Sequence, residues 1–85
     1  MPRTYDLKIW PKHFEDVRAG TKKYEVRRND RVFLVGDEIT LREWDPLPAT
    51  YTGRVCLVRI IHVTDSTSWE FIPVWITIFG IEVLT

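Results

Sequence analysis

The chain of 85 residues carries 12 Lys and Arg against 12 Asp and Glu residues, and 45% of its residues are hydrophobic. A chain of this length forms a single domain, residues 1–85, with one core, and its apolar content excludes disorder of the whole chain. The formal net charge of zero argues against a general nucleic-acid coat that binds phosphates nonspecifically.

The elements in the first third of the chain are a strand and a helix. Residues 5–10 alternate between apolar and polar side chains, which predicts a strand. Pro11 suits the first position of a helix, and Gly20 suits the residue just beyond its end. A helix between them would carry Phe14 and Val17 on one apolar stripe, so we expect a short helix that packs on a sheet.

The rest of the chain favours strands. Residues 23–28 and 38–44 alternate, whereas residues 54–63 and 74–83 are apolar on both faces, as in strands that are covered on both sides. Residues 29–39 indicate two turns around a short apolar piece. We therefore predict an α+β, mostly β fold: a small closed or nearly closed β-barrel of five or six strands, with one short helix between the first two strands.

The cysteine and histidine content limits which disulfides and metal sites the chain can form. Cys56 is the only cysteine and lies in an apolar run, so we expect a buried, inert thiol, no disulfide and a reducing compartment. Neither an apolar leader nor a membrane-spanning run is evident, which favours a cytoplasmic protein with no membrane contact. With two histidines and no metal-ligand spacing, we expect no metal and no cofactor, and we expect a monomer.

The basic residues are concentrated just after the predicted helix. Six of them lie in residues 18–31, against two acidic residues, whereas residues 65–85 contain no Lys or Arg. Lys22 falls in the turn after the helix, and Glu25 and Arg27 share one face of the next strand. These residues form either an ion-paired surface strand, worth about 0–1 kcal/mol per pair, or a site for a phosphate or carboxylate.

Three aromatic and basic residues are further candidates. Arg42 and Trp44 are two positions apart on one strand face, so they either contact a phosphate and stack on a base, or form an ion pair and pack at the barrel mouth. Trp10 precedes the helix and either forms a wall of a ligand site or packs against Phe14 as a hydrophobic staple.

Residues 20–27, GTKKYEVR, match the pattern G-x-K-x-x-E-x-R of ASCH domains, which are small β-barrels related to PUA domains. The chain also resembles a compact, mostly bacterial and phage-associated ASCH-like subfamily of unknown function, over roughly its first two-thirds. The segments that carry this resemblance are DLKIWPKHF, VGDEITLREWDP and YTGR. The resemblance implies a PUA-like barrel and a cleft that binds RNA or a nucleotide-like ligand. Its expected contacts are Lys22, Glu25 and Arg27, together with Arg42, Trp44 and Trp10.

Two alternatives remain open. Some small ASCH proteins are amidohydrolases that remove the acyl group from N4-acetylated cytidine, with a Lys at the position of Lys22 and a Thr at that of Glu25. This chain lacks that hydroxyl, so a binding module is favoured, and Lys22 and Glu25 are catalytic only if the protein is an enzyme. The other alternative is a phage or prophage accessory domain that binds a host protein through aromatic residues such as Phe71, Trp75 and Phe79.

Overall fold

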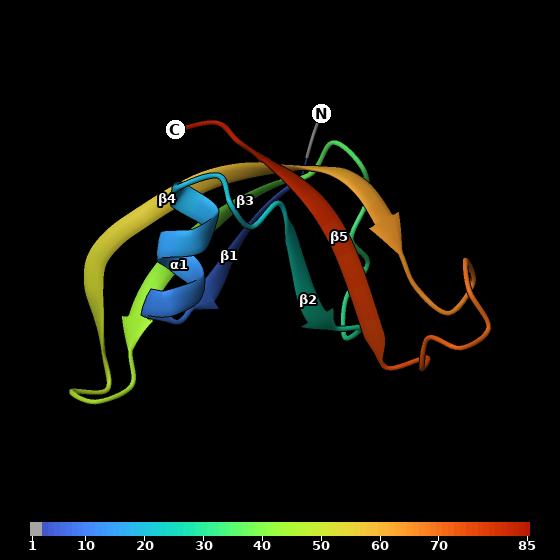
Figure 1. The fold of residues 1–85 in the computed structure, drawn as a ribbon, viewed down its shortest axis with the longest axis horizontal. Helices are drawn as coiled ribbons and strands as arrows, with labels where there is room; N and C mark the ends of the chain where they lie inside the picture. The colour runs from blue at the N-terminus through green and yellow to red at the C-terminus, as the bar shows by residue number, and fades with distance from the viewer. Residues whose placement is uncertain (1–2) are drawn as a thin grey trace.

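Five strands and one helix make up the computed structural model, which describes residues 3–85 (Figure 1). Their bounds are β1 Thr4–Ile9, α1 Pro11–Arg18, β2 Tyr24–Arg28, β3 Glu38–Asp45, β4 Thr50–Thr64 and β5 Ile76–Val83. The strands form one sheet in the order β1-β3-β4-β5-β2, in which β1 runs parallel to β3 and the other neighbours are antiparallel. A mostly β domain with one short helix between its first two strands is therefore confirmed.

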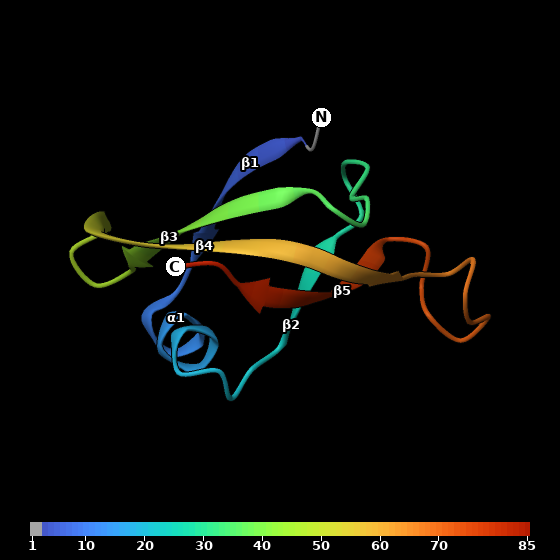
Figure 2. The ribbon, with the colours of Figure 1, turned by 90° about the horizontal axis from the view of Figure 1, so that it is seen from above.

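The sheet curls into a half-barrel and does not close. The 15-residue strand β4 arches across the molecule; α1 lies below it in the view of Figure 1 and to one side of it when seen from above (Figure 2). Register shifts in the pairing of β4 with β3 and with β5 accompany this bend, as expected of bulges. Since β1 pairs with β3 and β2 pairs with β5, these two strands are the edges of the sheet, and the predicted closure is replaced by an open seam between them.

The core occupies the concave face of the half-barrel. Phe14 and Val17 of α1 are fully buried, as the apolar stripe predicts, and they belong to one cluster with the inward residues of the strands. Cys56 is also fully buried, which confirms its predicted burial, and burial raises the pKa of this thiol. The helix of eight residues is thus held to the sheet by its apolar stripe.

The connection between β2 and β3 closes one end of the half-barrel. Phe33 from this segment is buried against Phe79, with ring centroids 4.8 Å apart. Asp37 accepts hydrogen bonds from Arg3 at 2.8 Å and from the backbone N–H of Leu34 at 3.0 Å. These contacts explain why residues 29–37 form an ordered connection, as the turn signals predict. Within residues 3–85, no helix is long and apolar enough to cross a bilayer.

Candidate functional site

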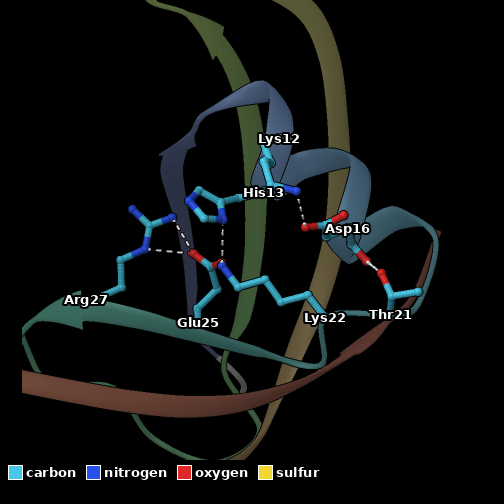
Figure 3. A network of polar contacts seen from close by, with 7 residues as sticks. All are labelled: Lys12, His13, Asp16, Thr21, Lys22, Glu25 and Arg27. Atoms are coloured by element: carbon cyan, nitrogen blue, oxygen red, sulfur yellow. Dashed lines mark hydrogen bonds and ion pairs between the residues drawn. The ribbon is translucent and has the colours of Figure 1, made fainter.

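The turn after α1 fixes the position of Lys22. Gly20 ends the helix with φ 82°, a left-handed conformation that favours glycine. The backbone N–H groups of Thr21 and Lys22 both donate to the carbonyl oxygen of Asp16, at 3.1 and 3.0 Å, and the Thr21 hydroxyl donates to the same oxygen. The helix end and the start of the next strand are therefore tied together, as Figure 3 shows for Thr21 and Asp16.

Strand β2 directs Glu25 and Arg27 to the concave side. Glu25 is paired with the fully buried Phe79 and Arg27 with the buried Thr77, both on β5. The side chain of Glu25 is 4% exposed, that of Lys22 16% and that of Arg27 22%. The ion pair of Glu25 with Arg27 is present, as the interpretation as an ion-paired strand predicts, but its carboxylate is buried between two cations and does not lie on the surface.

The three charges make contacts of unequal quality around the carboxylate (Figure 3). Arg27 donates from Nε and Nη2 to the same oxygen, Oε2 of Glu25, at 3.0 and 2.8 Å. Lys22 Nζ lies 3.2 Å from the other oxygen, Oε1, and 3.1 Å from Nδ1 of His13. Despite this ion pair, Oε1 is buried and accepts no well-directed hydrogen bond from residues 3–85. One carboxylate oxygen is therefore saturated, and the other retains capacity for a donor.

A cleft of about 660 Å³ opens over this charged group, and we call it the α1–β2 cleft. Its lining residues are Lys8, Ile9, Trp10, His13, Lys22, Tyr24, Glu25, Val26 and Arg27. The indole of Trp10 is 55% exposed, and Lys22 Nζ lies 5.4 Å from the centre of the Tyr24 ring. Basic, aromatic and carboxylate groups are therefore presented together at one concave surface.

The structure brings together four of the six predicted ligand-binding residues. Lys22, Glu25, Arg27 and Trp10 all line the α1–β2 cleft, whereas Arg42 and Trp44 do not. These last two contact polar residues of the neighbouring strand β1. Arg42 Nε donates to Asp6 Oδ2 at 3.0 Å. The Nζ of Lys8 lies 4.1 Å from the centre of the Trp44 ring, so that this indole sits behind the cleft rim.

Sequence reasoning missed His13 as a lining residue and gave Lys8 only as a weaker candidate, plausible as a solvated charge. His13 lies two positions after Pro11 on α1, and its contact with Lys22 depends on how the turn returns the chain toward the helix. No spacing signal in the sequence could have revealed that contact. Lys8 alternates with buried neighbours on β1 and reaches the cleft because β1 is an edge strand.

Another buried carboxylate, also missed, lies on β3. Glu43 accepts hydrogen bonds from Arg54, at 2.9 Å from Nε and 2.7 Å from Nη2, and from the Thr52 hydroxyl at 2.7 Å. These bonds, led by those from Arg54, lower the pKa of Glu43 to about 2. Arg54 also pairs with Glu15 and lies over the Phe14 ring, so that this cluster fastens α1 to the sheet.

The predicted aromatic surface near the C-terminal strand divides into two parts. Phe79 is fully buried in the core, so it cannot contact a partner, whereas Phe71 and Trp75 are exposed in the connection before β5. Across residues 3–85, no group of three or more His, Cys, Asp or Glu side chains is arranged to hold a metal ion.

Comparison with known proteins identifies the family of the chain. Residues 4–81 match the family described as domain of unknown function DUF3850. The chain is also 36% identical over 69 residues to a protein of Escherichia phage P2 named "Uncharacterized 12.9 kDa protein in GpA 3'region". That match covers 81% of this chain and 62% of the phage protein. Since the family match spans nearly all of the half-barrel, from β1 into β5, the chain belongs to the DUF3850 family.

Proposed function

We propose that the α1–β2 cleft binds RNA or a nucleotide-like ligand, and that this DUF3850 domain is a relative of the ASCH domains. The observation that carries the proposal is the buried Glu25 carboxylate, held between Lys22 and Arg27 at the base of a cleft with an exposed indole. Burying a charged group costs several kcal/mol per ion, and a site for a polar ligand is one reason to retain such a group.

Each lining group has a role that suits a nucleotide. The exposed rings of Trp10 and Tyr24 offer surfaces on which a base can stack. Lys22 and Arg27 supply positive charge for a phosphate. Glu25 Oε1 retains acceptor capacity for an N–H donor on a base, and because this oxygen is buried, a ligand would have to open its contact with Lys22 to reach it. Because the net charge of the chain is zero, we expect modest affinity that depends on these local contacts.

A titration with a matched pair of lysine variants tests this proposal. We expect ribonucleoside monophosphates and short single-stranded RNAs to shift the amide resonances of residues 22–27 and to quench tryptophan fluorescence. Lys22→Gln should weaken binding about tenfold, as for the loss of one charge-assisted contact. Lys23→Gln, which removes the exposed neighbouring charge, should leave affinity unchanged. If no nucleotide perturbs the cleft, or both variants bind equally, the proposed site is wrong.

A second candidate function is hydrolysis of an N4-acylated cytidine. The supporting observation is that Lys22 Nζ lies 3.2 Å from Glu25 Oε1 at the base of the cleft. In such a reaction Glu25 would activate a water molecule, and Lys22 would stabilise the oxyanion and protonate the leaving amine. The hydrogen bonds from Arg27 occupy Oε2 and leave only Oε1 for the base role.

Incubation with N4-acetylcytidine, followed by measurement of free cytidine, separates the two functions. We expect little or no turnover, because the carboxylate is already engaged by two cations. Rapid hydrolysis that is abolished by Glu25→Gln, with binding largely retained, would establish the enzyme instead.

A further inference from the structure

A second hollow lies at the far end of β2 from Lys22, with a volume of about 390 Å³, and we call it the arginine lobe. Its lining residues are Leu7, Val26, Arg27, Arg28, Asp30, Arg31 and Phe33. It lies beside the connection that follows β2, where Phe33 closes the end of the half-barrel. The function proposed for the α1–β2 cleft makes no use of this lobe.

The two hollows adjoin each other along the open seam of the sheet. Val26 and Arg27 line both of them. The edge strand β1 contributes Leu7 to the arginine lobe and Ile9 to the α1–β2 cleft. Since β1 and β2 are the two edges of the sheet (Figure 1), the groove follows β2 from the turn at Lys22 to the connection that begins with Asn29.

The groove is basic, and two of its arginines have little to neutralise them. Five Lys and Arg side chains line the two hollows, against Glu25 and Asp30. Among the described residues Arg28 makes no ion pair, and Arg31 has only a long contact of 3.9 Å with Asp30. By contrast, Arg59 on the body of the sheet is paired with both Glu38 and Glu82.

We propose that this groove binds a single-stranded oligonucleotide along β2, with one base in the α1–β2 cleft and neighbouring phosphates at Arg28 and Arg31. The five residues of β2 extend over roughly 13 Å at about 3.3 Å per residue, whereas stacked nucleotides advance about 3.4 Å each. The groove is therefore longer than one nucleotide. This inference rests on the proposed function and adds to it the length of the ligand and a second set of phosphate contacts.

The inference is tested by measuring the affinity of the protein for each RNA homotetramer and for the nucleoside monophosphate that carries the same base. DNA homotetramers are measured in the same way. We expect at least one tetramer to bind about a hundredfold more tightly than the monophosphate, because two further charge-assisted contacts form. The double variant Arg28→Gln/Arg31→Gln should remove this advantage and leave monophosphate affinity unchanged. The slope of log K against log salt for the tetramer should become shallower by about 1.4, the value for two phosphates of a single strand.

Arg59→Gln is the matched control, because it removes an arginine that lies outside both hollows. Circular dichroism should show both variants folded, since Arg28 and Arg31 are exposed and the side chain of Arg59, which pairs only with Glu38 and Glu82 among the described residues, is 41% exposed. Equal affinity for tetramer and monophosphate, or a double variant that binds tetramers like the wild type, overturns the inference and leaves the proposed function standing. Failure of every nucleotide to bind overturns both.

Discussion

Arg27 donates two hydrogen bonds to a single oxygen of Glu25, at 3.0 and 2.8 Å, and leaves the second oxygen to Lys22. Both residues lie on the concave face of β2, two positions apart, and the carboxylate is almost fully buried. The pair therefore has two consequences: removal of the carboxylate alone leaves partly buried cations unpaired, and the cleft depends on the pair for the position of its charges.

The first prediction concerns the stability that the pair contributes. Glu25→Ala should lower the free energy of unfolding by about 3–5 kcal/mol, because it leaves two cations partly buried without their carboxylate. The double variant Glu25→Leu/Arg27→Met should recover much of this loss, since apolar residues of similar size often replace buried ion pairs without cost. Urea denaturation of Glu25→Leu, of Arg27→Met and of the double variant measures the coupling. Independent, additive effects of the single changes would contradict the prediction.

The second prediction distinguishes a role of Trp10 in base stacking from a role in the stability of the fold. Trp10→Ala should change the free energy of unfolding by less than about 0.5 kcal/mol, because the indole is largely exposed. The same change should weaken nucleotide binding by about 1–3 kcal/mol, the usual value of base stacking on an aromatic ring. Trp69→Ala is the control, since Trp69 is 56% exposed and lies outside the cleft. If the two variants bind nucleotides equally well, Trp10 is not a contact of the ligand.

The third prediction concerns the glycine at the end of α1. Gly20→Ala should cost about 1–2 kcal/mol of stability, because an alanine at φ 82° is strained even though no atom lies near the added methyl group. Gly20→Asn should cost less, since asparagine tolerates this conformation. Thermal unfolding of the two variants provides the measurement. A Gly20→Ala variant as stable as the wild type would show that the turn adopts another conformation.

The fourth prediction concerns acid stability. Because the pKa of Glu43 is lowered from 4.5 to about 2 in the folded chain, its contribution to stability is complete above pH 4.5 and is lost as the pH falls from 4.5 toward 2. Glu43→Gln should reduce stability at pH 7, by about 2 kcal/mol for the lost charge-assisted bonds. The unfolding free energy of this variant should fall less steeply than that of the wild type across the same pH window. Parallel pH profiles for the two proteins would assign the acid sensitivity to other carboxylates.

Local patterns predicted the elements that position the cleft. The strand alternation of residues 23–28 correctly placed Glu25 and Arg27 on one face, and Pro11 and Gly20 correctly bounded the helix region. Alternation does not say which face is buried. That depends on the pairing of β2 with β5, a strand about fifty residues away in the chain, so the burial of Glu25 could not be read from its neighbours in sequence.

The same limit applies to Arg42 and Trp44. Their shared strand face suggested one binding surface, but the parallel neighbour β1 places Asp6 and Lys8 against them. Closure of the barrel was also overestimated, because strand count alone does not reveal that β1 and β2 remain edges of the sheet.

The pairing of β2 with β5 also affects the order in which parts of the domain fold while the chain is synthesised. The strand that carries Glu25 and Arg27 emerges early from the ribosome, but among the described strands it pairs with β5, which comes last of the five in chain order. Contacts of such large sequence separation form slowly. The nascent chain therefore carries this charged strand unpaired until β5 arrives, and the groove along β2 forms only after the other described strands have been made.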